Sequence, residues 1–303
     1  IVLAIVLAAC TVLANVGLLG VSAVLISMAA LQPPLLDLMV FIVGVRFFGI
    51  SRAILRYGER YLSHRITFQI LTKLRGMAYR RMEAATAEEW ENYSDGQLFD
   101  HLLGDIDVLQ YFYLKALLTP VAAGVVLVVC SMVLSIFSLE IVILLIGMFL
   151  FFGVVFPWSM RTLAKKQAKV LASERGHWQT LLEDYLGGLS EVLQGNQERE
   201  YQKRLFRSLH TIANIEHRSV LIENITVSFL QYGSNMSLVF ALCIIIPAIQ
   251  QNSLSGVYCA MVLLVVWSSF EAIVAFPQAL FQVERSIEAA KHITKFPLPS
   301  EQE

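Results

Sequence analysis

Cysteine and proline are scarce in this sequence, and charged residues are missing from long parts of it. The 303 residues include four cysteines and eight prolines. Each cysteine stands alone in an apolar run, without a C-x-x-C pair or metal-ligand spacing, so we expect free thiols rather than disulfides. Residues 1–36 and 224–270 contain no charged side chain at all. Such runs are far longer than a soluble core helix needs, and they predict a polytopic membrane protein.

Catalytic signatures are also absent. The sequence contains no G-x-x-x-x-G-K-[ST] motif, no H-E-x-x-H motif and no favoured Ser/His/Asp arrangement. The net charge of -1 gives no indication of a nucleic-acid partner, and we expect none. Any ATP hydrolysis would have to be supplied by another domain, so the sequence leaves open whether this chain is part of an enzyme.

Apolar segments recur six times along the chain, each close to the roughly 20 residues that a membrane-spanning helix requires. The expected spans are 1–27, 38–58, 116–137, 141–160, 225–249 and 256–281. The fold class that follows is an all-α membrane protein with six transmembrane helices and long cytoplasmic extensions.

The short connections between these spans lack basic residues. No Lys or Arg occurs around Pro33 and Pro34, in residues 138–140 or in residues 250–255. All 23 basic residues lie in the two long connections, in the tail or at the adjoining span ends. Because basic residues are enriched in cytoplasmic loops, we expect both termini and both long connections to be cytoplasmic.

The long connections are predicted to form helical arms. Residues 41–82 contain no proline, and one helix of that length reaches about 60 Å, against a hydrocarbon core of roughly 30 Å. The second arm, 161–223, alternates charged and apolar residues at helical spacing. Its expected breaks are Gly187, Gly188 and Gly195.

One face of the first arm carries polar side chains where the helix leaves its apolar span. At about 100° per residue, a single stripe holds two guanidiniums, a phenol and an imidazole, from Arg46, Tyr57, Arg60 and His64. A charged group near hydrocarbon costs about 2.5 to 3.5 kcal/mol, so this face is a candidate functional surface. For Arg46, contact with a substrate and snorkelling toward lipid headgroups both remain open.

Glu271 lies near the centre of the last expected span. An ion at that depth is costly, which favours a cavity or a buried partner for this carboxylate. We therefore predict a substrate cavity that includes Arg46 and Glu271. Asn15, Gln231 and Asn235 are explained equally well by hydrogen bonds between helices, so they carry little weight here.

Two cytoplasmic segments resemble the coupling regions of type I ATP-binding-cassette (ABC) exporters. The first combines W-x-x-Y, G-Q-L and D-x-D-x-L, and the second is LQGNQERE. The resemblance implies a transmembrane domain over 1–296 and a linker over 297–303 toward a nucleotide-binding domain that binds ATP and Mg²⁺. It also implies that four residues couple to nucleotide-binding domains: Trp90, Tyr93, Gly195 and Glu198.

Within that superfamily, R-x-x-x-R-Y-x-E-R-x-x-S-H at residues 52–64 resembles the CydC family. That family is one half of a bacterial heterodimeric exporter of cysteine and glutathione, required for cytochrome bd assembly. The resemblance implies a CydD-type partner half, an inner-membrane location and a bound b-type haem. It further implies that His64 is the axial iron ligand and that Arg60 and Lys115 contact the propionates, although Lys115 stands where arginine is expected.

Two other functions remain to be weighed. In the first, the chain is a half-exporter for a lipid, peptide or drug, and His64 is a structural histidine at the membrane boundary. In the second, the chain is an electron-transfer cytochrome without transport. The second fits poorly, because such a protein has no need of cytoplasmic arms of this length.

Overall fold

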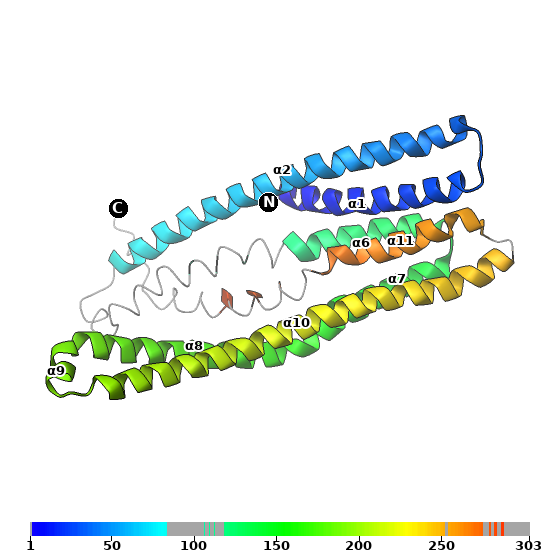
Figure 1. Ribbon diagram of the computed structural model, residues 1–303. Helices are drawn as coiled ribbons and strands as arrows, with labels where there is room; N and C mark the ends of the chain where they lie inside the picture. The colour runs from blue at the N-terminus through cyan, green and yellow to red at the C-terminus, as the bar shows by residue number, and fades with distance from the viewer. Residues whose placement is uncertain are drawn as a thin grey trace. The chain divides into compact units, whose positions relative to one another are not determined.

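A computed structural model describes residues 2–83, 118–251 and 254–274, with a few further positions between 106 and 112 and between 279 and 287. Among the described residues there are helices and no strands. Lys115, Trp90 and Tyr93 fall outside this part of the chain. The elements are shown in Figure 1 and are α1 (Val2–Ala29), α2 (Leu35–Glu83), α6 (Thr119–Ser135), α7 (Leu139–Leu150), the π-helix η3 (Phe151–Val155), α8 (Phe156–Gly187), α9 (Leu189–Gln194), α10 (Glu198–Gln250), the 3₁₀ turn η4 (Gly256–Tyr258), α11 (Cys259–Ser269) and the 3₁₀ turn η5 (Phe270–Ala272).

The helices confirm the predicted all-α membrane fold. Four helical stretches in the described part are long and apolar enough to cross a membrane, and two shorter apolar helices occupy the third and sixth expected spans. The long stretches are Val2–Ala29, Leu35–Met77, Leu139–Gly187 and Glu198–Gln250, and the shorter helices are Thr119–Ser135 and Gly256–Ala272. The cysteines are free thiols, as the sequence predicted.

The chain divides into two compact units. Unit 1 comprises residues 1–66, 113–159 and 226–280, and unit 2 comprises 67–112, 160–225 and 281–303. The boundaries fall inside α2, α8 and α10, so each of these helices contributes one segment to each unit. Unit 1 receives the apolar segment in each case, which is the division that hydropathy predicted.

Unit 1 has an apolar core built from α1, α6, α7, α10 and α11. Helix α1 packs against α11 and against α6. Close approach of α1 and α11 depends on a small residue, because a Cβ added at Gly20 would lie 3.1 Å from Val265 Cγ2. Phe270, at the end of α11, is 1% exposed and fixes this end of the helix in the core.

The π-helix η3 interrupts the helical run between α7 and α8, and no pattern in the sequence predicted it. Its Phe152 ring lies directly over Gly233 of α10, where an added Cβ would overlap the ring. Phe229, one turn earlier on α10, packs against Phe156 with ring centroids 4.0 Å apart. The π-helix, a rare form that occurs mostly as a single turn inside an α-helix, thus coincides with this aromatic contact.

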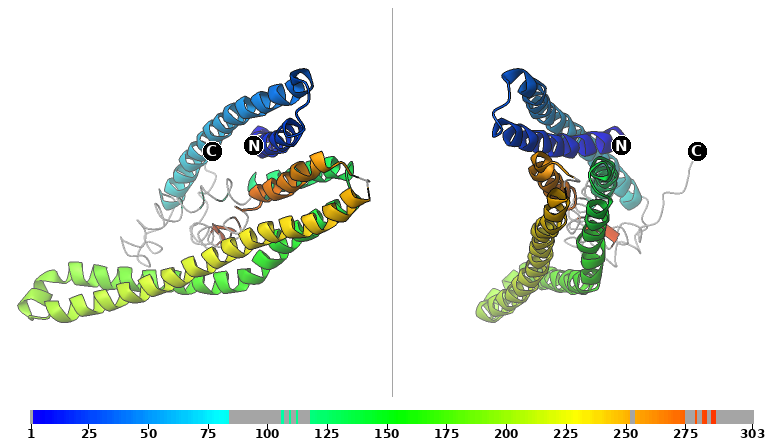
Figure 2. Two further views of the ribbon diagram at one scale, coloured as in Figure 1. Left: turned by 45° about the vertical axis from the view of Figure 1, so that its right-hand side comes forward. Right: turned by 90° about the vertical axis from the view of Figure 1, so that its right-hand side faces the viewer.

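Unit 2 contains a helical hairpin. Helices α8 and α10 run side by side with α9 at their joined ends, as two views show (Figures 1 and 2). Arg175 of α8 donates to Glu216 of α10 across 2.6 Å, and the Tyr185 and Tyr201 rings lie 5.8 Å apart. The ion pair is exposed, so it contributes little to stability. It shows which turns of α8 and α10 lie beside each other.

The ends of α9 confirm the predicted breaks in the second arm. Helix α8 ends at Gly187, and Gly188 and Gly195 flank α9. Asn196 has a left-handed backbone, with φ of 52°, a conformation that asparagine tolerates better than most residues. The chain therefore turns between α9 and α10 without a further glycine.

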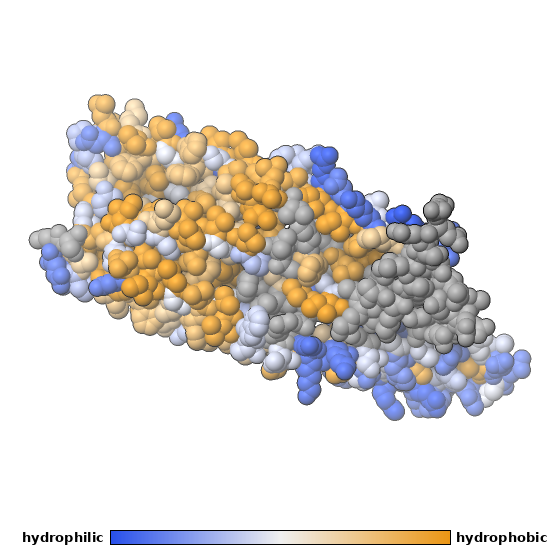
Figure 3. Space-filling view, turned by 180° about the vertical axis from the view of Figure 1, so that it is seen from behind, coloured by the Kyte–Doolittle hydropathy of each residue, from blue (hydrophilic) through white to orange (hydrophobic). Residues whose placement is uncertain are grey.

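The part of helix α2 that belongs to unit 1 exposes much of its apolar surface. The exposed side chains include Met39, Val43, Phe47, Ile50 and Ile54, and no residue of α2 belongs to the described core cluster. On the face in Figure 3, hydrophobic side chains gather over unit 1 and hydrophilic ones over the described part of unit 2. An apolar surface of this extent suits contact with lipid or with another membrane chain.

Candidate functional site

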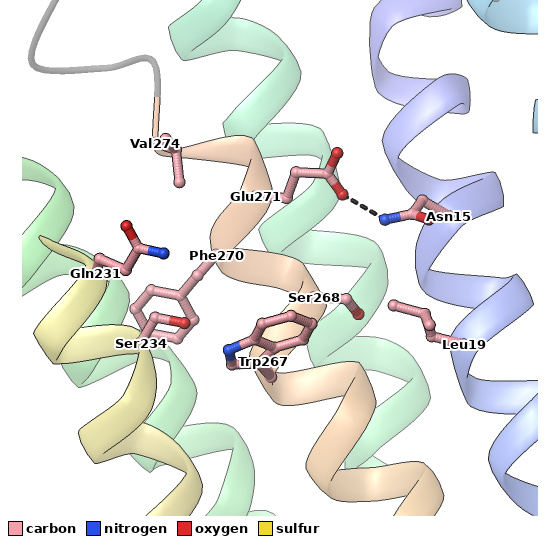
Figure 4. A pocket seen from close by; sticks show the side chains of 9 residues that line it. All are labelled: Asn15, Leu19, Gln231, Ser234, Trp267, Ser268, Phe270, Glu271 and Val274. Carbon is pink, nitrogen blue, oxygen red and sulfur yellow. Dashed lines mark hydrogen bonds between the residues drawn. The ribbon is translucent and has the colours of Figure 1, made fainter. Parts of the chain in front are cut away.

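Unit 1 contains a cavity of about 240 Å³. Three helical segments form it: α1, α10, and α11 with η5. Figure 4 shows α10 residues on one side, α1 residues on the other and α11 between them. The described lining residues are Asn15, Leu19, Gln231, Ser234, Trp267, Ser268, Phe270, Glu271 and Val274.

A hydrogen bond joins two walls of this cavity. Asn15 Nδ2 of α1 donates to Glu271 Oε2 of η5 (Figure 4). Asn15 is 8% exposed, whereas the Glu271 side chain is exposed. The amide is thus held within the helix packing and presents its N–H to a carboxylate at the open side. Both residues are positioned by the packing of α1 on α11.

The remaining walls are mostly apolar with a few polar groups. Ser234 and Ser268 are buried, and the Ser268 hydroxyl donates to the Val265 carbonyl oxygen at 3.3 Å. Trp267 is 42% exposed, so part of its indole remains accessible. A small number of polar groups on an apolar surface is the usual chemistry of a small-molecule site.

The predicted pair Arg46 and Glu271 is not brought together as a lining pair. Glu271 lines the cavity, but Arg46 is exposed on α2 and is not among the described lining residues. The structure instead joins Glu271 to Asn15. Asn15 and Gln231 carried little weight in the prediction, although an amide in a charge-free apolar run was an available signal.

The boundary face of α2, defined by Arg46, Tyr57, Arg60 and His64, is exposed at all four positions. Arg52 and Glu59, predicted to lie elsewhere around the helix, are half-buried. Tyr57 stacks on Tyr61 with ring centroids 6.5 Å apart. One side of the helix carries an accessible imidazole, guanidinium groups and a phenol, which have the chemistry that iron, propionates and a porphyrin face need. The residue types present therefore fit a haem.

The remaining predicted residues belong to the second arm or lie outside the described residues. Gly195 follows α9 and is exposed, and Glu198 begins α10. Trp90, Tyr93 and Lys115 are not described, so their roles stay predictions. Among the residues that were described, no group of three or more His, Cys, Asp or Glu is placed to hold a metal ion.

Comparison with known proteins gives two kinds of match. Residues 1–269 match the family model for the ABC transporter transmembrane region. The chain is 24% identical over 296 residues to the glutathione/L-cysteine transport system ATP-binding/permease protein CydC of Escherichia coli (strain K12), covering 96% of this chain and 52% of that protein. It is 33% identical over 192 residues to the corresponding CydD protein of Bacillus subtilis (strain 168), covering 63% of this chain and 33% of that protein.

These matches agree with the resemblance that the motifs indicated. The chain spans about half the length of the Escherichia coli relative. A third relative, the CydC protein of Haemophilus influenzae, is 21% identical over 254 residues, which are 83% of this chain and 44% of the relative. The helical architecture fits the transmembrane domain of a type I exporter. The chain therefore belongs to the family of ABC transporter transmembrane regions.

Proposed function

We propose that this chain is the transmembrane part of an ATP-driven half-exporter for cysteine- or glutathione-type thiols. The observation that carries the proposal is the similarity over 96% of the chain to a protein named for glutathione and L-cysteine transport. The cavity in unit 1 supports it for cysteine, because its size and its few polar groups suit a polar ligand of amino-acid size. Glu271 and Arg46 are the residues we assign to the substrate.

The exporter is proposed to be a heterodimer with a homologous CydD-type half. Both termini and both arms lie on the cytoplasmic side of a bacterial inner membrane, and thiols move from the cytoplasm to the periplasm or cell exterior. Nucleotide-binding domains with ATP and Mg²⁺ dock on Trp90, Tyr93, Gly195 and Glu198. Closure of those domains is transmitted through the helical arms as a rigid-body motion.

The same chain is proposed to hold a b-type haem at the boundary face of α2. His64 would ligate the iron, and Arg60 and Lys115 would pair with the propionates. Such charge-assisted hydrogen bonds contribute about 1.5 to 3 kcal/mol each when well made. When bound, the haem would supply one-electron redox chemistry. Support of cytochrome bd assembly is proposed for the thiol exporter as a whole.

A half-exporter for a lipid, peptide or drug is the second candidate. The observation in its favour is the mostly apolar wall of the cavity, together with the exposed apolar side of α2. The two candidates differ in the ligand that stimulates ATP hydrolysis.

ATPase activity of the full-length heterodimer in lipid nanodiscs tests the proposal. Cysteine or glutathione should stimulate hydrolysis, whereas serine and S-methylglutathione, which lack a free thiol, should stimulate it much less. Stimulation by lipids or hydrophobic peptides with no response to either thiol would favour the second candidate and overturn the first.

A further inference from the structure

We propose that the unit 1 cavity contains an ammonium subsite, in which the Glu271 carboxylate and the Trp267 indole bind the primary ammonium of a ligand of amino-acid size. The inference rests on the proposed function only in taking this cavity to be on the substrate path. Asn15 is assigned as a positioning residue that holds the carboxylate.

The charge of the cavity walls sets the sign of the ligand group. Glu271 is the one charged residue among the described lining residues, and no lysine or arginine accompanies it there. A carboxylate without a basic neighbour repels an anion and attracts a cation. The ligand group that faces it is therefore positively charged.

The hydrogen bond from Asn15 fixes how the carboxylate is presented. Oε2 of Glu271 accepts from Asn15 Nδ2, and Oε1 has no hydrogen-bond partner among the described residues (Figure 4). One oxygen is thus anchored to α1 while the other is available to a donor. An ammonium group carries three N–H donors and no acceptor, so it complements the available oxygen.

Trp267 supplies a second contact for a cation. Its side chain lines the same cavity four residues before Glu271, about one helical turn away. The faces of tryptophan rings attract cations more strongly than those of tyrosine or phenylalanine, and the attraction grows when the cation leaves water. The carboxylate and the indole line one cavity from neighbouring turns of the chain, the carboxylate on the α1 side (Figure 4), and the proposed subsite uses both.

The volume of the cavity limits the ligand. A cavity of about 150 Å³ holds a benzene molecule, so about 240 Å³ has room for one amino acid. A tripeptide would extend well outside it. Because no described cluster of His, Cys, Asp or Glu could hold a metal ion, an organic ammonium is favoured over a metal cation.

Binding of three related thiols to the full-length heterodimer in nanodiscs tests the subsite. Cysteine carries thiol, ammonium and carboxylate, cysteamine lacks the carboxylate, and 3-mercaptopropionate lacks the ammonium. Glu271→Gln removes the charge but keeps the side-chain length and an acceptor for Asn15. It should weaken the binding of cysteine and cysteamine by about ten- to a hundredfold. The binding of 3-mercaptopropionate, an anion that the Glu271 carboxylate repels, should not weaken.

Matched variants separate the subsite from general damage. Glu140→Gln makes the same change at an exposed carboxylate of α7 and should leave all three affinities unchanged. Trp267→Phe should retain more cysteamine affinity than Trp267→Leu, because phenylalanine keeps an aromatic face. The subsite would be overturned if Glu271→Gln lowered the binding affinities of all three thiols equally, or if it lowered none of them.

The results also distinguish this inference from the proposed function. If cysteine binds and Glu271→Gln affects the three thiols alike, the subsite is wrong while thiol export stands. If alanine and ethylamine bind in a Glu271-dependent manner and no thiol binds more tightly than they do, the ammonium subsite is supported. The proposed selectivity for thiols is then wrong. If wild-type protein binds none of these compounds, both proposals are overturned.

Discussion

Asn15 and Glu271 lie 256 positions apart in the sequence, and the amide of the first donates a hydrogen bond to the carboxylate of the second. The bond ties α1 to the end of α11 inside a membrane-spanning unit. Interhelical hydrogen bonds in membranes contribute about 0.6 kcal/mol on average and up to about 1.7. The pair therefore connects the first and last described spans at modest energetic gain.

A double-mutant cycle measures this connection. Asn15→Ala and Glu271→Ala should each lower the free energy of unfolding, and the double variant should lose about 0.6 to 1.7 kcal/mol less than the sum. Unfolding in detergent with increasing sodium dodecyl sulfate provides the measurement. Strictly additive losses would mean that the hydrogen bond contributes nothing to the fold.

Gly233 is predicted to be intolerant of any side chain. Because an added Cβ would overlap the Phe152 ring, Gly233→Ala should destabilise the protein by about 1 to 3 kcal/mol, the usual range for overpacking. Gly147→Ala is the control: a Cβ there meets no atom within 4 Å, and alanine favours a helix by about 0.5 to 1 kcal/mol over glycine. In thermal unfolding, the midpoint temperature of Gly233→Ala should be lower than that of the wild-type protein, whereas the midpoint temperature of Gly147→Ala should not be. Equal midpoints for the two variants would contradict the packing of Phe152 on Gly233.

The topology prediction is tested by cysteine labelling in a background that lacks the four native cysteines. Gln251 follows α10 in a connection without basic residues, so Gln251→Cys should react with an impermeant reagent outside intact cells. Gln197, exposed beside α9, is the control, and Gln197→Cys should react only after permeabilisation. The reverse pattern would overturn the orientation.

The haem proposal is tested by absorption spectroscopy of the heterodimer supplied with haem. Loss of the iron ligand in His64→Ala should abolish or strongly shift the Soret band. Removal of one charge in Lys115→Ala should only lower haem occupancy, since the iron bond remains. Absence of a Soret band from the wild-type protein would contradict haem binding. An unchanged band in His64→Ala would contradict His64 as the iron ligand.

Hydropathy and glycine positions were sufficient to predict most of the fold. Spans follow from long apolar runs, and the breaks around α9 follow from Gly188 and Gly195, because these signals are local. The π-helix η3 was not predicted, because no local pattern marks it and Phe152 within it meets Gly233 of a helix distant in sequence. The same limit applies to the cavity: Glu271 stood out by its depth in a span and Trp267 lies one helical turn before it, but no local pattern joins either residue to Asn15, which lies 256 positions from Glu271.

Thiol export is tested most directly by ATP-driven transport of radiolabelled cysteine, and in parallel of glutathione, by the full-length heterodimer in proteoliposomes. Wild-type protein should accumulate cysteine with ATP and not with a non-hydrolysable analogue. Arg46→Ala and Glu271→Ala should lower that accumulation severalfold, whereas Glu140→Ala should not. Absence of ATP-dependent accumulation of both cysteine and glutathione would contradict thiol export. Full transport in both Arg46→Ala and Glu271→Ala would contradict the assigned substrate residues.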